Sequence, residues 1–396
     1  MTQPRPAPGG FPVVGVIGGG QLARMMQPAA IELGIQLSVL AEAPDASAAL
    51  VVPSAPVGPH DDLEAVRGFA AACDVVTFDH EHVPALVLAA LERDGVVLHP
   101  RPSALRFAQD KLAMRERLTE LGVSCPRWAR ARDAAEVEAF GAQTGWPVVA
   151  KTPRGGYDGK GVRVVAGAEE LADWLEVVGQ EGALRDGILL EERVAFVREL
   201  AVLVARSPSG QASAWQVVET VQTDGMCTEV LAPAPGIDPA LAGAVTEVGL
   251  RIAGALDVTG VLAVELFEVL SGGRPTYLVN ELAMRPHNSG HWSMDGAVTS
   301  QFEQHLRAVL DLPLGDPSAR APWTAMANVL GGDLPELYPA YLHVMAHDPA
   351  AKVHMYGKAV RPGRKIGHVT VCGPSLADAR ARATHAADYL QGAIHE

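Results

Sequence analysis

Hydrophobic residues along the chain form short apolar runs that alternate with stretches of helical period. Residues 12–20 predict a strand that ends in a glycine turn, residues 21–34 predict a helix, and residues 35–42 predict a second strand. This strand–helix–strand order indicates a parallel sheet covered by helices. The apolar residues 74–83 and 95–100 predict later strands of the same sheet.

The middle of the chain follows a different pattern. Residues 102–123 have a helical period, and residues 125–131 follow them as a connector. Residues 146–165 predict strands around a glycine-rich loop. Further strands are predicted at residues 187–194, 198–207, 260–270 and 275–283. A helix at residues 300–312 precedes a proline-containing linker at residues 314–322.

The pattern and the length of 396 residues together predict three domains. We expect an α/β fold with a Rossmann-like domain at residues 1–122. The second domain, at residues 123–316, is expected to be of the α+β type, and residues 317–396 are expected to form a small cap domain.

Composition narrows the class of function. The formal net charge of −14 disfavours a nucleic-acid surface but permits small anionic substrates held by local basic groups. The four cysteines are far apart, which is typical of a reducing compartment. No apolar run has the length of a membrane span, and residues 1–12 lack the apolar core of a signal peptide. We therefore expect a cytoplasmic protein.

The first glycine motif, Gly18–Gly20 followed by Ala23, lies between the first strand and the first helix. Its spacing, with Glu42 further on, is typical of dinucleotide-binding turns and favours a nicotinamide-dependent oxidoreductase. Backbone N–H groups at a helix N-terminus bind any phosphate, however, so another phosphorylated ligand fits equally well. A tight turn without a ligand is the third interpretation.

The second glycine motif covers residues 155–161 and lacks the Walker A pattern. It is either a plain hairpin or a loop that folds over phosphates. Lys151 ends the apolar strand before this loop. A lysine there needs an anionic partner, and a nucleotide phosphate is a suitable one.

A pair of carboxylates is predicted on the hairpin that spans residues 260–283. A turn centred on Gly273 places Glu265 directly opposite Glu281. Like charges at that position repel one another unless a proton or a cation lies between them, and two carboxylates suit Mg²⁺. Glu268 has the opposite parity and faces away. A shift in register would remove the pair.

These features together resemble the ATP-grasp superfamily. The runs at residues 18–25, 77–84, 151–161, 280–292 and 360–368, in this order, are similar to those of the N5-carboxyaminoimidazole ribonucleotide synthase family. The resemblance implies an ATP-grasp fold. It also implies ATP-dependent and bicarbonate-dependent carboxylation of 5-aminoimidazole ribonucleotide through carboxyphosphate, a step of purine biosynthesis. Mg²⁺ would serve as cofactor, and a homodimer is expected.

The resemblance assigns residues to each ligand. For ATP they are Arg106, Lys151, Gly156, Tyr157, Asp158, Gly159, Lys160, Gly161, Val162, Glu191, Glu192, Arg193, Val194, Glu199, Gln222, Asn280 and Glu281. For the ribonucleotide they are Gly20, Gln21, Leu22, Glu81, Tyr157, Asp158, Lys160, Lys358, Arg361 and Arg364. Arg285, His287 and Asn288 would hold bicarbonate and, with Lys358, form the catalytic set, while Glu265 and Glu281 would bind Mg²⁺.

Some positions depart from the family pattern or leave alternatives open. Gln222 stands where many relatives have histidine, which places an acid–base role there in doubt. His80 and His82 share one face of a predicted strand, and packing is favoured over a zinc site. Other functions compatible with the pattern are a formate-dependent glycinamide ribonucleotide transformylase, the oxidoreductase, and a protein that binds nucleotide without turnover.

Overall fold

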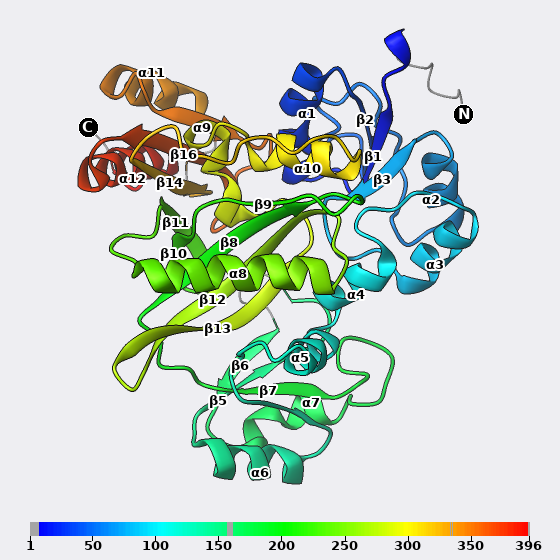
Figure 1. Cartoon of the computed structure of the whole chain (residues 1–396), viewed down its shortest axis with the longest axis vertical. Coiled ribbons are helices and arrows are strands. Elements are labelled where there is room, and N and C mark those ends of the chain that lie inside the picture. Colours follow the sequence, from blue (N-terminus) through cyan, green and yellow to red (C-terminus); the bar gives the residue numbers. More distant parts are fainter. Residues whose placement is uncertain (1–7, 157–160, 333, 335, 395–396) are drawn as a thin grey trace.

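The computed structural model describes residues 8–156, 161–332, 334 and 336–394, and Figure 1 shows their arrangement. The N-terminal part is a parallel sheet of strands β1 (Val13–Ile17), β2 (Gln36–Leu40) and β3 (Val75–Phe78), in the order β2-β1-β3. Its helices are α1 (Gln21–Leu33), α2 (Leu63–Ala70), α3 (Ala85–Arg93), α4 (Pro102–Gln109) and α5 (Lys111–Glu120), after the 3-10 turn η1 (Pro8–Gly10). The predicted strand–helix–strand unit is therefore confirmed.

One prediction in this part is wrong, and another is confirmed with more detail. Residues 95–100 form no strand and contribute only a single bridge, between Leu98 and Val76, before Pro100 removes the next backbone donor. The helical period of residues 102–123 is confirmed, and this stretch forms two helices, α4 and α5. Asp110 separates them because its carboxylate accepts hydrogen bonds from the N–H groups of Leu112 and Ala113 and so begins α5.

A small antiparallel sheet forms the lobe at the bottom of Figure 1. Its strands are β4 (Trp128–Ala131), β5 (Val148–Lys151), β6 (Val162–Val165) and β7 (Ile188–Glu192), in the order β4-β7-β5-β6. The helices of this lobe are α6 (Ala134–Thr144), η2 (Ala168–Leu171) and α7 (Ala172–Leu175). Residues 125–131 are thus not only a connector, because β4 pairs with β7 along its whole length.

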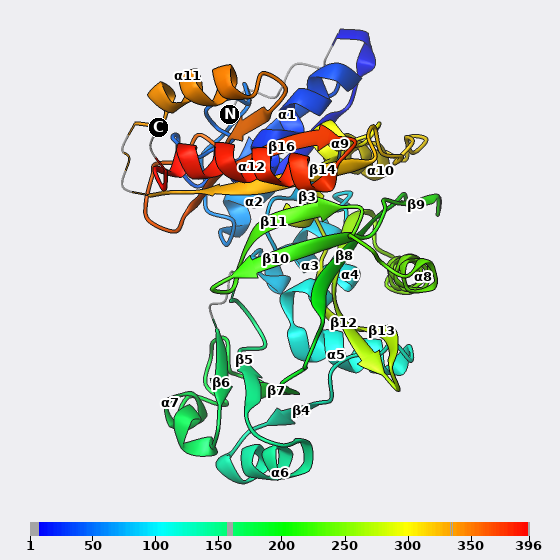
Figure 2. The same cartoon turned by 90° about the vertical axis from the view of Figure 1, so that its left-hand side faces the viewer.

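The largest sheet has nine strands and is antiparallel throughout the described pairings. The strands are β8 (Arg198–Arg206), β9 (Ala212–Ala214), β10 (Val218–Thr223), β11 (Met226–Ala232), β12 (Gly260–Ser271), β13 (Arg274–Ala283), β14 (Trp323–Leu330), β15 (Lys352–Met355) and β16 (Lys365–Gly373). Figure 2 shows the small lobe standing below this sheet.

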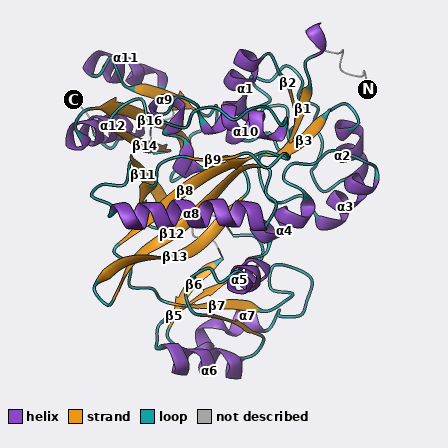
Figure 3. Cartoon of the chain, viewed as in Figure 1, coloured by secondary structure: helices purple, strands orange, loops and turns teal. Residues whose placement is uncertain are grey.

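Helices cover the large sheet and connect it with the N-terminal part (Figure 3). They are α8 (Pro239–Ala255), η3 (Asn288–Gly290), α9 (Ser293–Gly296), α10 (Gln301–Val309), α11 (Tyr338–His347) and α12 (Leu376–Gln391). Val245, Val248 and Ile252 of α8 are buried in the same core as Val202 and Val204 of β8. Since α10 shares a second core with α1, the N-terminal part is fixed against the large sheet.

The predicted cap contributes strands to the large sheet. β11 pairs with β14 in the register Glu229↔Ala327, and β14 pairs with β16. The sheet thus continues past residue 316, while the domain limits 1–122, 123–316 and 317–396 stay predictions. The α/β class, with an α+β nucleotide-binding part, is confirmed by this topology. Within the described ranges, no helix combines the length and apolar character needed to cross a membrane.

Candidate active site

The hairpin of β12 and β13 places Glu265 directly opposite Glu281, as predicted. The reasoning behind this pairing needs one correction. The turn consists of Gly272 and Gly273, and Ser271 pairs with Arg274, so the turn alone would leave the carboxylates out of register by one position. A bulge beside Glu265 takes up one extra residue on the partner strand and restores the pair.

The two carboxyl groups have opposite electrostatic surroundings. Burial, together with the charges of Glu281 and Glu199, raises the pKa of Glu265 to about 7. Burial acts on Glu281 in the same direction, but the ammonium groups of Lys111 and Lys151 outweigh it and lower the pKa of Glu281. Nζ of Lys111 lies 2.5 Å from Oε1 of Glu281. One carboxyl group of the pair is thus neutralised by a lysine, while the pKa of the other is raised.

A buried ion network joins this hairpin to Arg115 of α5 and to the small lobe. Arg115 has no exposed surface and donates to Oε1 of Glu191 at 2.6 Å, while Nζ of Lys151 lies 2.7 Å from the other carboxylate oxygen. Lys151 also donates to Oδ1 of Asn280 at 3.1 Å, and Arg115 donates to the carbonyl oxygens of Val279 and Asn280. The predicted Lys151, Glu191 and Asn280 are therefore in contact. These two cations lower the pKa of Glu191 to about 2 in spite of its burial.

The segment after β13 brings Arg285 and His287 close to the carboxylate pair, and Asn288 follows them in the chain. Nε2 of His287 lies 3.5 Å from Oε1 of Glu265. Burial lowers the pKa of His287 to about 3, and the charges of Arg285 and Lys365 act in the same direction. Its Nδ1 accepts from the Ser289 N–H at 3.3 Å, so the proton of the neutral ring is on Nε2, which faces Glu265. His287 is thus a neutral donor.

Other contacts hold this segment in place. Gln301 accepts from the His287 N–H at 2.8 Å and donates to the His287 carbonyl oxygen at 2.9 Å. The side-chain amides of Asn288 and Asn328 donate to each other. Nε of Arg285 lies 2.8 Å from Oε1 of Glu81. A residue predicted to bind bicarbonate is thus paired with one predicted to bind the ribonucleotide.

The first glycine turn contains a group that the sequence analysis did not assign. The partly buried carboxylate of Asp79 accepts from the Ala23 N–H at 2.7 Å, at the N-terminus of α1. A Cβ atom on Gly20 would lie 2.0 Å from Oδ2 of Asp79, so a side chain there would displace this carboxylate. Leu22 is buried, and Lys358 donates to the side chain of Gln21. The cap thus reaches the glycine turn through Lys358.

The remaining predicted residues occupy separate places. Glu199 on β8 and Gln222 on β10 lie together, and their side chains form a hydrogen bond. Burial raises the pKa of Glu199, and the hydrogen bond from Gln222 partly opposes this rise. Exposed side chains are those of Arg106, Arg193, Arg361 and Arg364. Within the described part of the chain, Arg106 stacks on Phe107 and makes no hydrogen bond or ion pair with Lys151.

The loop predicted to cover the ATP phosphates is only partly described. Tyr157, Asp158, Gly159 and Lys160 lie outside the described residues. Gly156 and Gly161, which flank them, have φ angles of 77° and 73°, a region that favours glycine. Val162 begins β6, and the Thr152 N–H donates to the Gly161 carbonyl oxygen, so β5 and β6 frame the loop. Glu192 pairs with Arg127, and Val194 is half-buried beyond the end of β7.

Comparisons with known proteins cover nearly the whole chain. Residues 12–109 match the model of the ribonucleotide synthetase preATP-grasp domain, and residues 116–302 match that of the ATP-grasp domain. Residues 324–382 match the phosphoribosylaminoimidazole carboxylase C-terminal domain. The N5-carboxyaminoimidazole ribonucleotide synthase of Mycobacterium bovis is 53% identical over 384 residues, which cover 96% of this chain and 88% of that protein. This chain belongs to the N5-carboxyaminoimidazole ribonucleotide synthase family.

Other members of the synthase family agree with this assignment. The synthase of Corynebacterium ammoniagenes is 50% identical and covers 97% of this chain and 93% of its own length. Among solved structures, the synthetase of Thermus thermophilus has a TM-score of 0.83 at 37% identity, covering 97% of this chain and 99% of its own. The synthase of Aspergillus clavatus, in complex with ADP and 5-aminoimidazole ribonucleotide, has a TM-score of 0.84 at 33% identity. The match covers 96% of this chain and 99% of that one.

Membership of the synthase family makes the oxidoreductase alternative wrong. The geometry of the glycine turn is consistent with that correction. Glu42, the acid that a dinucleotide-binding protein would offer to a ribose, accepts instead from the Gly19 N–H at 3.2 Å. The ATP-grasp fold implied by the resemblance is confirmed.

The site contains residues that the sequence analysis missed, chiefly Lys111, Arg115, Asp79 and Gln301. Lys111 and Arg115 are on α5, whose weak amphipathic pattern gives no sign of a buried cation. The sequence did contain an indication of Asp79, because this residue directly follows the fully buried parallel strand β3. Ligands commonly bind at the carboxyl ends of such strands.

Proposed function

We propose that this chain carboxylates the exocyclic amine of 5-aminoimidazole ribonucleotide at the expense of ATP, with bicarbonate as carboxyl donor. It would release ADP and phosphate through a carboxyphosphate intermediate. The observation that carries the proposal is the convergence of Glu265, Glu281 and Lys151 with Arg285 and His287 at one end of the β12–β13 hairpin. Phosphoryl transfer depends mainly on positioning and on neutralising charge, which this set of side chains supplies.

Each group has a distinct part in this proposal. Lys151 is held between Glu191 and Asn280 and would contact ATP phosphate oxygens. Arg285 supplies a fixed positive charge for bicarbonate, while neutral His287 donates a hydrogen bond from Nε2. Lys358, placed beside Gln21, would bind the ribonucleotide together with the glycine turn. Glu81 is oriented by Arg285 and would accept from the ribose hydroxyls.

The donor set also fits Mg²⁺, which we propose as the metal. Two carboxylates on adjacent strands offer the hard oxygen ligands that Mg²⁺ prefers, and the raised pKa of Glu265 indicates that a cation would relieve repulsion there. Bound Mg²⁺ would supply charge neutralisation on the transferring phosphoryl group. Lys111 would then keep Glu281 ionised and oriented.

Phosphate release from Mg-ATP tests the proposed reaction when each substrate is omitted in turn. We expect release that requires both bicarbonate and the ribonucleotide and that is matched by carboxylated product. Release that is indifferent to the ribonucleotide would indicate another acceptor. The absence of release under every condition would favour a protein that binds nucleotide without turnover.

The raised pKa of Glu265 predicts a pH-dependent stability difference between the wild type and Glu265→Gln. The folded state binds the proton of Glu265 more tightly than the unfolded state does, because the pKa of this group is higher in the folded protein. The stabilising contribution of the bound proton is complete below the ordinary pKa of a glutamate and is lost as the pH rises through about 7. We expect the variant, which mimics the protonated form, to exceed the wild type in stability at pH 8 by on the order of 1–3 kcal/mol. At pH 5 the two proteins should be nearly equal.

Thermal unfolding at the two pH values, without metal, measures this difference. Addition of Mg²⁺ at pH 8 should raise the melting temperature of the wild type and leave that of Glu265→Gln nearly unchanged. Equal melting temperatures at pH 8 would contradict the assigned surroundings of Glu265.

His287→Ala is expected to raise the bicarbonate concentration needed for half-maximal rate by about tenfold or more, since one charged-ligand hydrogen bond contributes about 1.5–3 kcal/mol. The KM for ATP should change by less than about twofold, because His287 contacts Glu265 and Ser289 rather than Lys151. Steady-state rates with varied bicarbonate measure the effect. His385→Ala on α12 serves as the control and should keep the wild-type bicarbonate dependence. If His287→Ala changed only the KM for ATP, His287 would belong to the nucleotide site.

We further propose a homodimer in the cytoplasm. The family resemblance supports the dimer. The four cysteines form no disulfide in the described part of the chain, which supports a reducing compartment. Sedimentation at micromolar concentration would distinguish a dimer from a monomer.

A further inference from the structure

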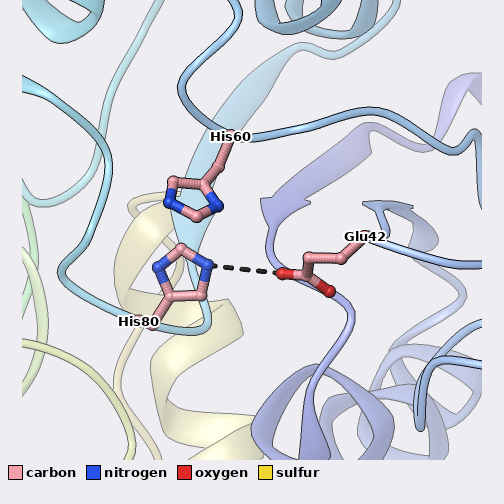
Figure 4. Close-up of side chains that lie close together, drawn as sticks. All are labelled: Glu42, His60 and His80. Carbon is pink, nitrogen blue, oxygen red and sulfur yellow. Dashed lines mark ion pairs between the residues drawn. The ribbon is translucent and has the colours of Figure 1, made fainter.

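A group of three side chains on the N-terminal part has no place in the proposed reaction. Glu42, His60 and His80 converge at the carboxyl edge of the parallel sheet (Figure 4). Glu42 lies two residues after β2, His80 lies two residues after β3, and His60 is in the loop before α2. Ligands of open parallel sheets bind at this edge, because the loops that follow the strands meet there.

The donor atoms of the three side chains are close enough for one ion. One ligand atom from each residue lies within 4.8 Å of the other two. The rings of His60 and His80 meet edge to face with centroids 4.7 Å apart, and Figure 4 shows the Glu42 carboxylate pointing toward His80. All three residues are in loops, so the contraction needed for metal–ligand bonds of about 2 Å requires no change in a strand or helix.

The inward-facing atoms of Glu42 and His80, Oε1 and Nε2, face each other. Oε2 of Glu42 accepts from the Gly19 N–H, which fixes the carboxylate while Oε1 faces His80. Nε2 of His80 is buried and faces Oε1 at a distance of 3.4 Å, and an ion bound between these two atoms would replace their direct interaction. A ligating carboxylate held by a backbone donor is typical of metal sites.

His80 also shows what metal binding would change. Its Nδ1 accepts from the His82 N–H at 3.1 Å, so in the metal-free protein the ring proton is on Nε2. Coordination through Nε2 requires that proton to move to Nδ1, which breaks the hydrogen bond from His82. A metal–imidazole bond is much stronger than one peptide hydrogen bond, so this exchange does not prevent binding.

We propose that Glu42, His60 and His80 bind one divalent transition-metal ion of the zinc type. Two imidazoles and one carboxylate select Zn²⁺, Co²⁺ or Ni²⁺ over Mg²⁺ and Ca²⁺, which prefer oxygen ligands. Three protein ligands leave a fourth position open, as in zinc sites that exchange water or a ligand. The Glu42 side chain is 46% exposed, so an ion can enter the site from the side of this carboxylate.

This site replaces the histidine pair considered from the sequence. His80 and His82 are not on a strand, because β3 ends at Phe78, and both residues are in the loop that follows. The ring of His82 stacks on that of His80 with centroids 5.1 Å apart, and His82 is not one of the three converging donors. His60, which is 20 positions earlier in the chain than His80, takes its place.

Titration with Co²⁺ in the presence of excess Mg²⁺ tests the proposal on the full chain. Mg²⁺ fills oxygen-ligand sites such as the Glu265–Glu281 pair, and visible absorption bands report Co²⁺ bound by imidazole. We expect saturable binding of one Co²⁺ per chain, reversed by Zn²⁺. His60→Ala and Glu42→Gln should each weaken it by at least about tenfold, in keeping with the loss of a direct ligand.

Two control variants make the outcome decisive. His82→Ala removes the neighbouring ring and should keep the binding. His385→Ala disrupts a second histidine group, in which Nε2 of His343 lies 3.3 Å from Nε2 of His385, and should also keep it. Loss of Co²⁺ binding in His385→Ala but not in His60→Ala, or no saturable binding at all, would overturn the proposal. Because binding is read without turnover, the result is independent of the proposed carboxylation.

Discussion

Glu281→Gln is expected to lower the rate of phosphate release from Mg-ATP by about a thousandfold or more, because charge stabilisation at a phosphoryl group is the largest part of such catalysis. The substitution removes one of the two carboxylates opposed on the β12–β13 hairpin, and with it the proposed Mg²⁺ ligand. It also leaves Lys111 without its carboxylate partner at 2.5 Å. The measurement is phosphate release with saturating bicarbonate and ribonucleotide over a range of Mg²⁺ concentrations.

The fold of Glu281→Gln should remain intact. Loss of the Lys111 ion pair destabilises the folded state, but loss of a negative charge beside Glu265 relieves the repulsion that contributes to its raised pKa. The two effects oppose each other, so a change of only a few degrees in melting temperature is expected. Glu247→Gln on the exposed surface of α8 is the control and should keep the wild-type rate. A normal Mg²⁺-dependent rate in Glu281→Gln would end the metal assignment.

Arg115→Met should cause the largest loss of stability among single changes near the site, on the order of 3–5 kcal/mol, because it breaks a buried ion pair from one side. Arg115 is fully buried and donates to Glu191 and to two main-chain carbonyl oxygens of β13. Methionine fills the space of the aliphatic stem but provides no donor. The melting temperature of the first unfolding transition measures the loss.

The loss of stability in Arg115→Met is expected to come mainly from the buried oxygen atoms that no longer accept a hydrogen bond from Arg115. Lys151 remains 2.7 Å from Glu191 and moderates the loss. Adding Glu191→Gln to Arg115→Met should therefore recover part of the stability, since the uncompensated charge is removed. Arg117→Met is the control, two positions away on α5. Within the described structure Arg117 pairs only with the exposed Glu120, so this variant should change the free energy of unfolding by less than about 0.5 kcal/mol. Equal melting temperatures for the two single variants would show that the buried network does not stabilise the fold.

Much of the fold followed from local patterns. The first strand–helix–strand unit was predictable because its strands are continuous apolar runs and its helix begins at a glycine turn. The opposed glutamates were also predicted, but the turn geometry was not: the two-residue turn shifts the register by one position and the bulge shifts it back. A single hairpin sequence fits both arrangements, and in the folded chain β12 also pairs with β8 on its other edge.

The candidate site was only partly visible in the sequence. Arg285, His287 and Asn288 stand out because polar residues crowd the end of an apolar strand. Lys111 and Arg115 do not, because each lies among other charged residues on a helix of ordinary composition. Their importance arises from partners more than 70 positions away, Glu281 and Glu191, and no local pattern records such a separation.

The sequence by itself determined the local elements, the glycine turns and the chemical types of the site residues, because these depend on neighbours within a few positions. Tertiary structure alone decided three things: the addition of β14, β15 and β16 to the large sheet, the pairing of buried charges, and the convergence of Glu42, His60 and His80. Each depends on the distance between residues remote in the chain. The free energy of burying the whole core fixes those distances, and no single segment specifies them.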